Sequence, residues 1–157
     1  MPDATFHFPD DFRWGVATAA HQVEGNNSNN DWWAWEQVQG HVARGDVSGL
    51  ACNWWEDAEA DFDRAAAMGV KGLRLSVEWS RIEPQPGTFD EEALARYVEM
   101  AEGLRGRGIE PMVTLHHFTN PRWLAEGGGW EEPETVDRFA RFVKRVSEAL
   151  APTCDLW

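Results

Sequence analysis

The sequence alternates short apolar segments with longer segments of helical periodicity, and this order limits the chain to folds built on a parallel sheet. The segments that read as strands are residues 12–18, 70–77 and 109–116, and a fourth begins at 155–157. Between them, apolar side chains recur every three or four residues, which indicates helices. A strand–helix–strand order predicts an α/β fold with parallel strands and right-handed crossovers. The near-continuous apolar character of the strands also predicts burial on both faces of the sheet.

Residues that favour helix ends divide these segments. Asn53 stands three residues before a glutamate, so we expect it to cap the first helix, which ends at Gly69. Thr88 or Asp90 opens the second helix, which ends at two nearby glycines. Pro133 marks the start of a third helix. Its expected apolar face consists of Val136, Phe139, Ala140, Val143, Val146 and Leu150.

The strand spacing is too wide for a chain of this length to complete a barrel. Strands begin at residues 70, 109 and 153, which are 39 and 44 residues apart. Eight such units need more than 157 residues, since (β/α)8 barrels run from about 200 to more than 400 residues. A doubly wound sheet of this length would hold about five strands, and only three and a start occur. We therefore expect part of a larger fold rather than a small complete α/β domain.

The charge balance argues against nucleic-acid and membrane-surface partners. Asp and Glu number 27 against 14 Lys and Arg, a net charge of −13, whereas phosphate backbones and anionic lipids bind clustered cations. No apolar run approaches the roughly 20 residues of a spanning helix, and residues 1–12 show no secretion-signal pattern. Cys52 and Cys154 lie far apart and form no C-x-x-C, which favours reduced thiols. We expect a cytoplasmic protein with no nucleic-acid and no membrane partner.

Polar and aromatic side chains gather where the predicted strands end, at the edge of a parallel sheet where functional loops lie. The clusters are residues 20–25, 74–81 and 116–121, with Trp32, Trp33 and Trp35 on the first loop. Amides and imidazoles bind sugar hydroxyls, and flat rings cover the C–H face of a pyranose. The pattern favours a sugar ligand, although tryptophan clusters are more common as core or loop packing.

Histidines and an arginine in these clusters narrow the chemistry. His116 and His117 are adjacent in a strand and point to opposite faces, so they do not readily share a metal ion. No third ligand stands at a suitable spacing, and we expect no metal and no cofactor. Arg74 lies within an apolar strand and cannot lose its charge, so it requires an anionic partner. Glu78 is a local candidate, and a carboxylate from a strand outside this chain is the other.

Three ordered motifs cover nearly the whole chain. They are FPDDFRWGVATAAHQVEG at residues 8–25, GLRLSVEWSRI at 72–82, and TLHHF at 114–118 with PRWL at 121–124 and GGW at 128–130. In this order they resemble the N-terminal, second-strand and third-strand motifs of glycoside hydrolase family 1, the β-glucosidase and β-galactosidase family. The resemblance extends to the second-strand pattern R-x-S-x-x-W-x-R-I, which begins at Arg74.

The resemblance implies that residues 1–157 are the N-terminal part of a single catalytic TIM (β/α)8 barrel, with about the first three βα units and the start of strand four. It implies a β-glycosidase that hydrolyses β-linked glucosides or related glycosides with retention. Gln22 and His117 match the family's pair that hydrogen-bonds the sugar, and Arg74 matches the arginine beside the nucleophilic carboxylate. Phe118, where many members carry Trp, and Trp33 of the first loop complete the expected substrate-binding set.

Neither catalytic carboxylate of the family occurs in these residues. Members continue beyond a segment such as Cys154–Trp157 into a T-x-N-E-P motif that supplies the acid/base, and a later E-N-G motif supplies the nucleophile. Retaining hydrolysis needs both carboxyl groups, about 5–5.5 Å apart. We therefore expect no catalytic residue and no activity in the isolated chain, and two partners: a β-glycoside or oligosaccharide substrate and the remainder of the barrel. The alternative is a non-catalytic sugar-binding module, or a half-barrel that assembles with another.

Overall fold

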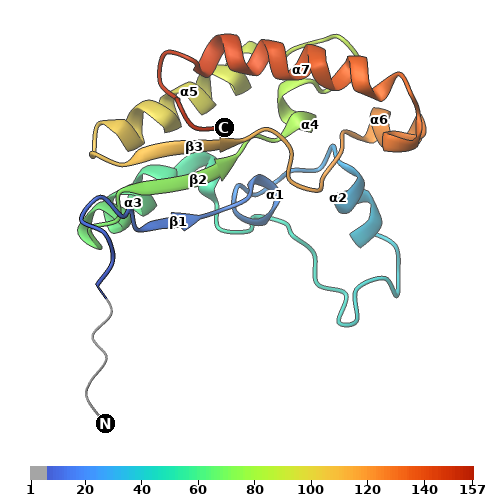
Figure 1. Cartoon of the computed structure of the whole chain (residues 1–157). Coiled ribbons are helices and arrows are strands. Elements are labelled where there is room, and N and C mark those ends of the chain that lie inside the picture. Colours follow the sequence, from blue (N-terminus) through green and yellow to red (C-terminus); the bar gives the residue numbers. More distant parts are fainter. Residues whose placement is uncertain (1–6) are drawn as a thin grey trace.

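A computed structural model describes residues 7–157 and contains a sheet of three parallel strands with helices packed on one face (Figure 1). The strands are β1 (Gly15–Ala17), β2 (Gly72–Ser76) and β3 (Glu110–Thr114), in the spatial order β1-β2-β3. In the register, Val16 lies beside Leu73, and Leu73 beside Pro111. The three predicted strands are confirmed. Each is shorter than its apolar run, because a strand extends only as far as its neighbour offers backbone partners.

The chain returns to the sheet beside β3 after the last helix. Leu156 forms a parallel bridge with Met112, and the N–H of Val113 donates to the Leu156 carbonyl oxygen at 2.9 Å. The strand start predicted at residues 155–157 is therefore present as a single bridge. It lies on the opposite side of the sheet from β1.

Three long helices follow the strands and confirm the three predicted from the sequence. They are α3 (Trp54–Ala67), α5 (Glu91–Arg105) and α7 (Thr135–Leu150). Shorter segments lie in the loops: α1 (Ala20–Val23), α2 (Asp31–Glu36), α4 (Trp79–Ile82), α6 (Arg122–Glu126) and the 3-10 turn η1 (Gly129–Glu131). These were not predicted, because such short segments hold too few residues to show a helical repeat.

Two helix ends behave as the sequence predicts. The Oδ1 atom of Asp90 accepts the N–H groups of Glu92 and Ala93, each at 3.0 Å, so Asp90 rather than Thr88 caps α5. Gly69 follows α3 with a φ of +79°, a left-handed conformation that glycine adopts without strain.

Two other details of the helices were predicted wrongly. Asn53 precedes α3 but has a φ of +54° and makes no capping hydrogen bond. Its N–H donates to Leu50 in a tight turn, and the Glu24 carbonyl oxygen accepts the N–H of Trp55 at 3.0 Å instead. Val136 and Ala140 were expected on the apolar face of α7 but are exposed, Val136 to 69%, because Thr135 and Phe142 face the core instead.

The sheet is packed against the helices on one face and open on the other. Leu73, Leu75 and Val113 are buried in the core that the sheet forms with the helices, and Val16, Val77 and Leu115 pack in the same core. On the other face, Met112 is 42% and Leu156 is 39% exposed. Burial on both faces is the expectation for the complete barrel, and residues 7–157 leave the second face open, since nothing among them packs over it.

A buried carboxylate ties α4 to the neighbouring helices. Glu83 accepts the indole N–H of Trp79 at 2.8 Å and the N–H of Gly87 at 2.6 Å, and it pairs with the guanidinium of Arg141 on α7. Its backbone carbonyl oxygen accepts the indole N–H of Trp123 on α6 at 2.9 Å. These bonds fix the position of α4, which carries residues of the strand-end loops.

Within residues 7–157, each helix is too short or too polar to cross a membrane. The expectation of no secretion signal falls partly on residues 1–6, which lie outside the described residues.

The open face of the sheet predicts that the isolated chain associates. We expect it to elute above its monomer mass of 17.8 kDa in size-exclusion chromatography with light scattering, because apolar side chains and a strand edge are exposed. Met112→Lys should raise the monomer fraction, since a charge on this face opposes its burial. Met68→Lys, at a 71% exposed position just after α3, should leave the fraction unchanged. A monomeric wild-type chain would contradict the prediction.

Candidate functional site

The loops that follow the three strands meet at one edge of the sheet, where α1, α2 and α4 also lie (Figure 1). The N–H of Ala20 donates to the hydroxyl oxygen of Ser76 at 2.7 Å and joins the first loop to the end of β2. Asp31 of α2 accepts the backbone N–H of Asn120 at 2.9 Å and its side-chain amide at 2.8 Å. These bonds hold the first loop against the second and third.

The four residues predicted to bind a sugar lie on these loops and differ in exposure. Gln22 is exposed on α1, and Phe118 is 60% exposed on the loop after β3. Trp33 and His117 are partly buried. The backbone N–H of Trp33 donates to the side chain of Asn30 at 2.8 Å, which caps α2. Their contacts with a sugar stay predictions.

Aromatic rings connect the first and third loops in a row. The rings of His117 and Phe118 are 4.6 Å apart, and Phe118 stacks on Trp32 at 5.5 Å with an interplanar angle of 9°. Trp32 in turn meets the edge of His21 at 5.9 Å. Trp32, rather than Trp33, is therefore the indole that reaches the third loop. A hollow of about 470 Å³ adjoins this row, lined by His21, Asp31, Trp32, Trp35, Glu36 and Val42.

Both histidines of this row favour the neutral form. Burial lowers the pKa of His21, whose Nδ1 lies 3.0 Å from the side-chain amide of Asn30. Burial, together with the nearby charge of Arg74 and with His116, lowers the pKa of His117. A neutral imidazole carries one donor and one acceptor. The Asn30 amide donates to Nδ1 of His21, which leaves the Nε2–H of His21 as a donor, whereas a neutral His117 can bond a hydroxyl group in either sense.

Arg74 has no partner in Glu78, so that alternative is wrong. Its guanidinium donates to the Thr18 carbonyl oxygen at 3.2 Å, and its buried Nε atom has no hydrogen-bond partner within residues 7–157. Glu78 is held elsewhere, by the hydroxyl groups of Ser80 at 2.8 Å and Thr119 at 2.9 Å. Glu78 lies in the segment between β2 and α4, where these two hydroxyl groups hold it. A carboxylate from outside this chain stays the predicted partner.

A buried network of carboxyl and hydroxyl groups lies beneath the loops, and the sequence analysis missed it. The Tyr97 hydroxyl donates to Glu24 Oε1 at 2.6 Å and accepts the backbone N–H of Glu78 at 2.9 Å. Glu24 Oε2 also accepts the side chains of Asn27 at 2.9 Å and Arg81 at 3.0 Å. The available signal was a glutamate directly after a valine in each of two motifs, at Val23–Glu24 and Val77–Glu78.

Burial dominates the electrostatics of this network. It raises the pKa of Glu78 to about 7, with a further increase from the charge of Glu24 and opposing effects of the hydroxyl groups of Ser80 and Thr119. Burial also raises the pKa of Glu24, opposed by Arg81, Tyr97 and Asn27. Both carboxyl groups are 1% exposed, so neither can touch a substrate in this structure.

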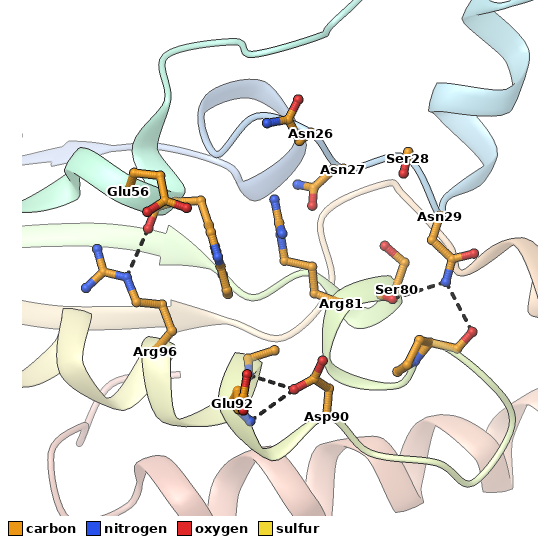
Figure 2. A pocket seen from close by; sticks show the side chains of 13 residues that line it. Asn26, Asn27, Ser28, Asn29, Glu56, Ser80, Arg81, Asp90, Glu92 and Arg96 are labelled. Atoms are coloured by element: carbon orange, nitrogen blue, oxygen red, sulfur yellow. Dashed lines mark hydrogen bonds between the residues drawn. The ribbon is translucent and has the colours of Figure 1, made fainter.

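A second hollow, of about 450 Å³, lies outside the loops between the N-terminal ends of α3 and α5 (Figure 2). Asn26–Asn29 form one side, and Arg96 lies on the other. Arg81 projects between them toward Asn27, and its Cζ atom lies 4.1 Å from the centroid of the Trp55 ring. Through its bond to Glu24, Arg81 joins this outer hollow to the buried network.

The strand-end surface is therefore suited to binding a polar ligand. It offers stacked rings, neutral imidazoles and one fixed cation, which are groups that recognise a polar ring-shaped ligand. Within residues 7–157, no group of three or more His, Cys, Asp or Glu side chains is arranged to hold a metal ion.

The chain is similar in sequence and in structure to known glycosidases. The chain is 35% identical over 154 residues to a β-glucosidase of Agrobacterium sp., and the alignment covers 94% of this chain and 34% of the relative. It matches the crystal structure of β-glycosidase BGL167 with a TM-score of 0.89 and 44% identity, over 94% of this chain and 35% of that one. A Thermotoga maritima β-glucosidase in complex with castanospermine matches with a TM-score of 0.92 and 32% identity, over 96% of this chain and 36% of that one.

The glycosyl hydrolase family 1 model matches residues 4–157, and the chain belongs to this family. The solved structures it resembles are family 1 glycosidases, which are TIM barrels. The chain corresponds to the N-terminal part of the family and spans about a third of the length of the relatives it matches.

The raised pKa of Glu78 predicts a stability that falls as pH rises. The ordinary value is 4.5 and the folded value about 7, so the folded state binds more protons between these two values. Stability present below the lower value is lost as pH approaches the upper one, by on the order of 3 kcal/mol. Glu78→Gln cannot ionise, so its melting temperature relative to wild type should rise between about pH 5 and about pH 7.5.

The measurement is thermal unfolding of the complete barrel, meaning this chain together with the rest of its barrel. Glu56→Gln, at an exposed carboxyl group of the outer hollow, is the matched control and should show no such trend. A difference between Glu78→Gln and wild type that stays constant with pH would contradict the assignment.

Proposed function

We propose that the chain forms the first three βα units and the start of strand four of a single (β/α)8 barrel. The complete barrel is a retaining β-glycosidase that hydrolyses β-linked glucosides or related β-glycosides. Support comes from the family membership, from relatives named β-glucosidase and from the row of rings and imidazoles at the strand ends. The remainder of the barrel is the partner that supplies both catalytic carboxylates.

The placement of Arg74 carries this proposal. Its guanidinium is partly buried beside the strand-end loops and lowers the pKa of His117. A buried cation is stable only when an anion faces it. In a retaining glycosidase the nucleophilic carboxylate meets this need, and the positive charge keeps that carboxylate ionised.

The binding roles follow from the chemistry of the exposed groups. Gln22 and His117 hydrogen-bond the hydroxyl groups of the sugar, and Trp33 and Phe118 cover its apolar face. A Thermotoga maritima relative forms a complex with castanospermine, and we expect this compound to bind to these four residues in the complete barrel. The chain alone hydrolyses no substrate, because bond cleavage requires two carboxyl groups about 5–5.5 Å apart.

The alternative of a non-catalytic module is not favoured, since the matched relatives are glycosidases. Sustained turnover of an aryl β-glycoside by the isolated chain would overturn its assignment as the inactive part of the enzyme. We also propose a cytoplasmic location, because Cys52 and Cys154 are both free thiols.

Gln22→Ala and His117→Ala in the complete barrel should each lower kcat/KM for an aryl β-glucoside by about 10- to 100-fold. Each removes a hydrogen bond that strengthens as the sugar ring flattens in the transition state. Gln39→Ala, an exposed glutamine in the turn after α2, is the matched control and should retain wild-type kinetics. Wild-type kinetics in both Gln22→Ala and His117→Ala would refute the binding roles.

Arg74→Ala should move the acidic limb of the pH–rate profile to higher pH. Loss of the neighbouring positive charge raises the pKa of the nucleophilic carboxyl group, so this group is protonated at higher pH. Arg74→Lys keeps a positive charge and should shift the limb less. If the limb does not move in Arg74→Ala, Arg74 has only a structural role.

A further inference from the structure

One buried network joins the three loops that carry the proposed sugar-binding residues. Glu24 lies on the first loop, two residues after Gln22. Glu78 follows β2, and Thr119 stands two residues after His117 on the third loop. We call Glu24, Tyr97, Glu78 and Thr119 the carboxylate network. All four are buried, with exposures of 1% to 6%.

Tyr97 is the centre of this network and comes from none of the three loops. It projects from α5, and its hydroxyl group touches the first loop through the carboxylate of Glu24 at 2.6 Å. The same hydroxyl group touches the second loop through the backbone N–H of Glu78 at 2.9 Å. One phenol oxygen therefore fixes the distance between two loops.

Thr119 extends the connection to the third loop. Its hydroxyl group donates to Glu78 at 2.9 Å, and its backbone N–H donates to the carbonyl oxygen of His117, also at 2.9 Å. Phe118, between the two, has a φ of +69°, a left-handed conformation that a bulky residue adopts only when neighbouring contacts hold it. Anchoring Thr119 thus constrains the backbone that carries His117.

Burying the carboxylate network in this space costs stability. Two carboxyl groups are buried together. The charge of Arg81 from α4 and the hydroxyl group of Tyr97 from α5 act on Glu24, and the charge of Glu24 acts on Glu78. Apolar side chains of similar volume would fill a core at lower cost in stability. Hydrogen bonds, unlike apolar contacts, specify direction and distance, so the network can define the geometry of the loops.

We propose that Tyr97, with Glu78 and Thr119, positions Gln22 relative to His117 so that both reach one sugar. These are positioning residues, because they are buried and act through the loops they connect. The inference rests on the proposed function, since it assumes that Gln22 and His117 bind the sugar.

The test is Tyr97→Phe in the complete barrel, which keeps the buried ring and removes only the bridging oxygen. We expect the dissociation constant for castanospermine, measured by calorimetry, to rise about tenfold, and KM for an aryl β-glucoside to rise more than kcat falls. Thr153→Val is the matched control, because it removes another buried hydroxyl group, bonded to Leu150 at the end of α7. It should leave the dissociation constant for castanospermine and KM unchanged.

A double variant separates positioning from a general loss of stability. If Tyr97 acts through Gln22, Tyr97→Phe should weaken castanospermine binding much less in a Gln22→Ala background than in wild type. Thr119→Val should reproduce the effect from the other end of the network, and Thr119→Ser should restore wild-type binding. If Tyr97→Phe does not fold, Thr119→Val and Thr119→Ser still test the positioning role.

The outcomes distinguish the inference from the proposed function. If Gln22→Ala and His117→Ala weaken castanospermine binding but Tyr97→Phe and Thr119→Val do not, the positioning role is wrong and the function stands. Additive effects in the double variant also overturn positioning. If Gln22→Ala and His117→Ala leave binding unchanged, the proposed binding roles and the positioning role both fail.

Discussion

The pairing of β2 with both neighbours is the constraint on which the rest of the structure depends. β1 approaches so closely that a Cβ atom on Gly15 would lie 2.8 Å from the Gly72 carbonyl oxygen, so this position requires glycine. The parallel register then brings the carboxyl ends of all three strands to one edge. The loops that carry Gln22, Glu78 and His117 lie at the same edge because the strands that precede them are aligned.

Buried carboxyl groups in this chain have two different kinds of partner, and this difference determines their behaviour. Glu83 faces the guanidinium of Arg141, so its charge has a counter-charge across the helix contact. The carboxyl oxygens of Glu78 accept the hydroxyl groups of Ser80 and Thr119, no cationic side chain among residues 7–157 pairs with them, and the charge of Glu24 lies nearby. Burial without a counter-ion raises its pKa, so a proton on Glu78 relieves part of the cost of burying two carboxyl groups together.

The sequence predicted what depends on local periodicity and missed what depends on distant contacts. The three strands, the three long helices and the cap at Asp90 follow from patterns within a few residues, and the structure confirms them. The bond between Glu24 and Tyr97 joins positions 73 residues apart, and no local pattern encodes it. The pairing of Arg74 with Glu78 was wrong for a related reason, since Glu78 bonds instead to Thr119, which lies 41 residues further along the chain. The strand-end clusters themselves were predictable, because parallel strands place their following loops together.

Completion of the proposed barrel and completion of its site are the same physical event. Arg74 and Met112 lie side by side in the register, and Leu156 continues their row, so the fixed cation and the exposed apolar side chains share one face of the sheet. Burial of Met112 and Leu156 by further strands would remove water from Arg74 at the same time, which makes an anionic partner obligatory. A closing strand that brought only apolar residues would leave a buried, unpaired guanidinium. In the proposed enzyme, the strands that seal this face must therefore also carry the carboxylate, and the free energy gained by closing the barrel holds that carboxylate against Arg74.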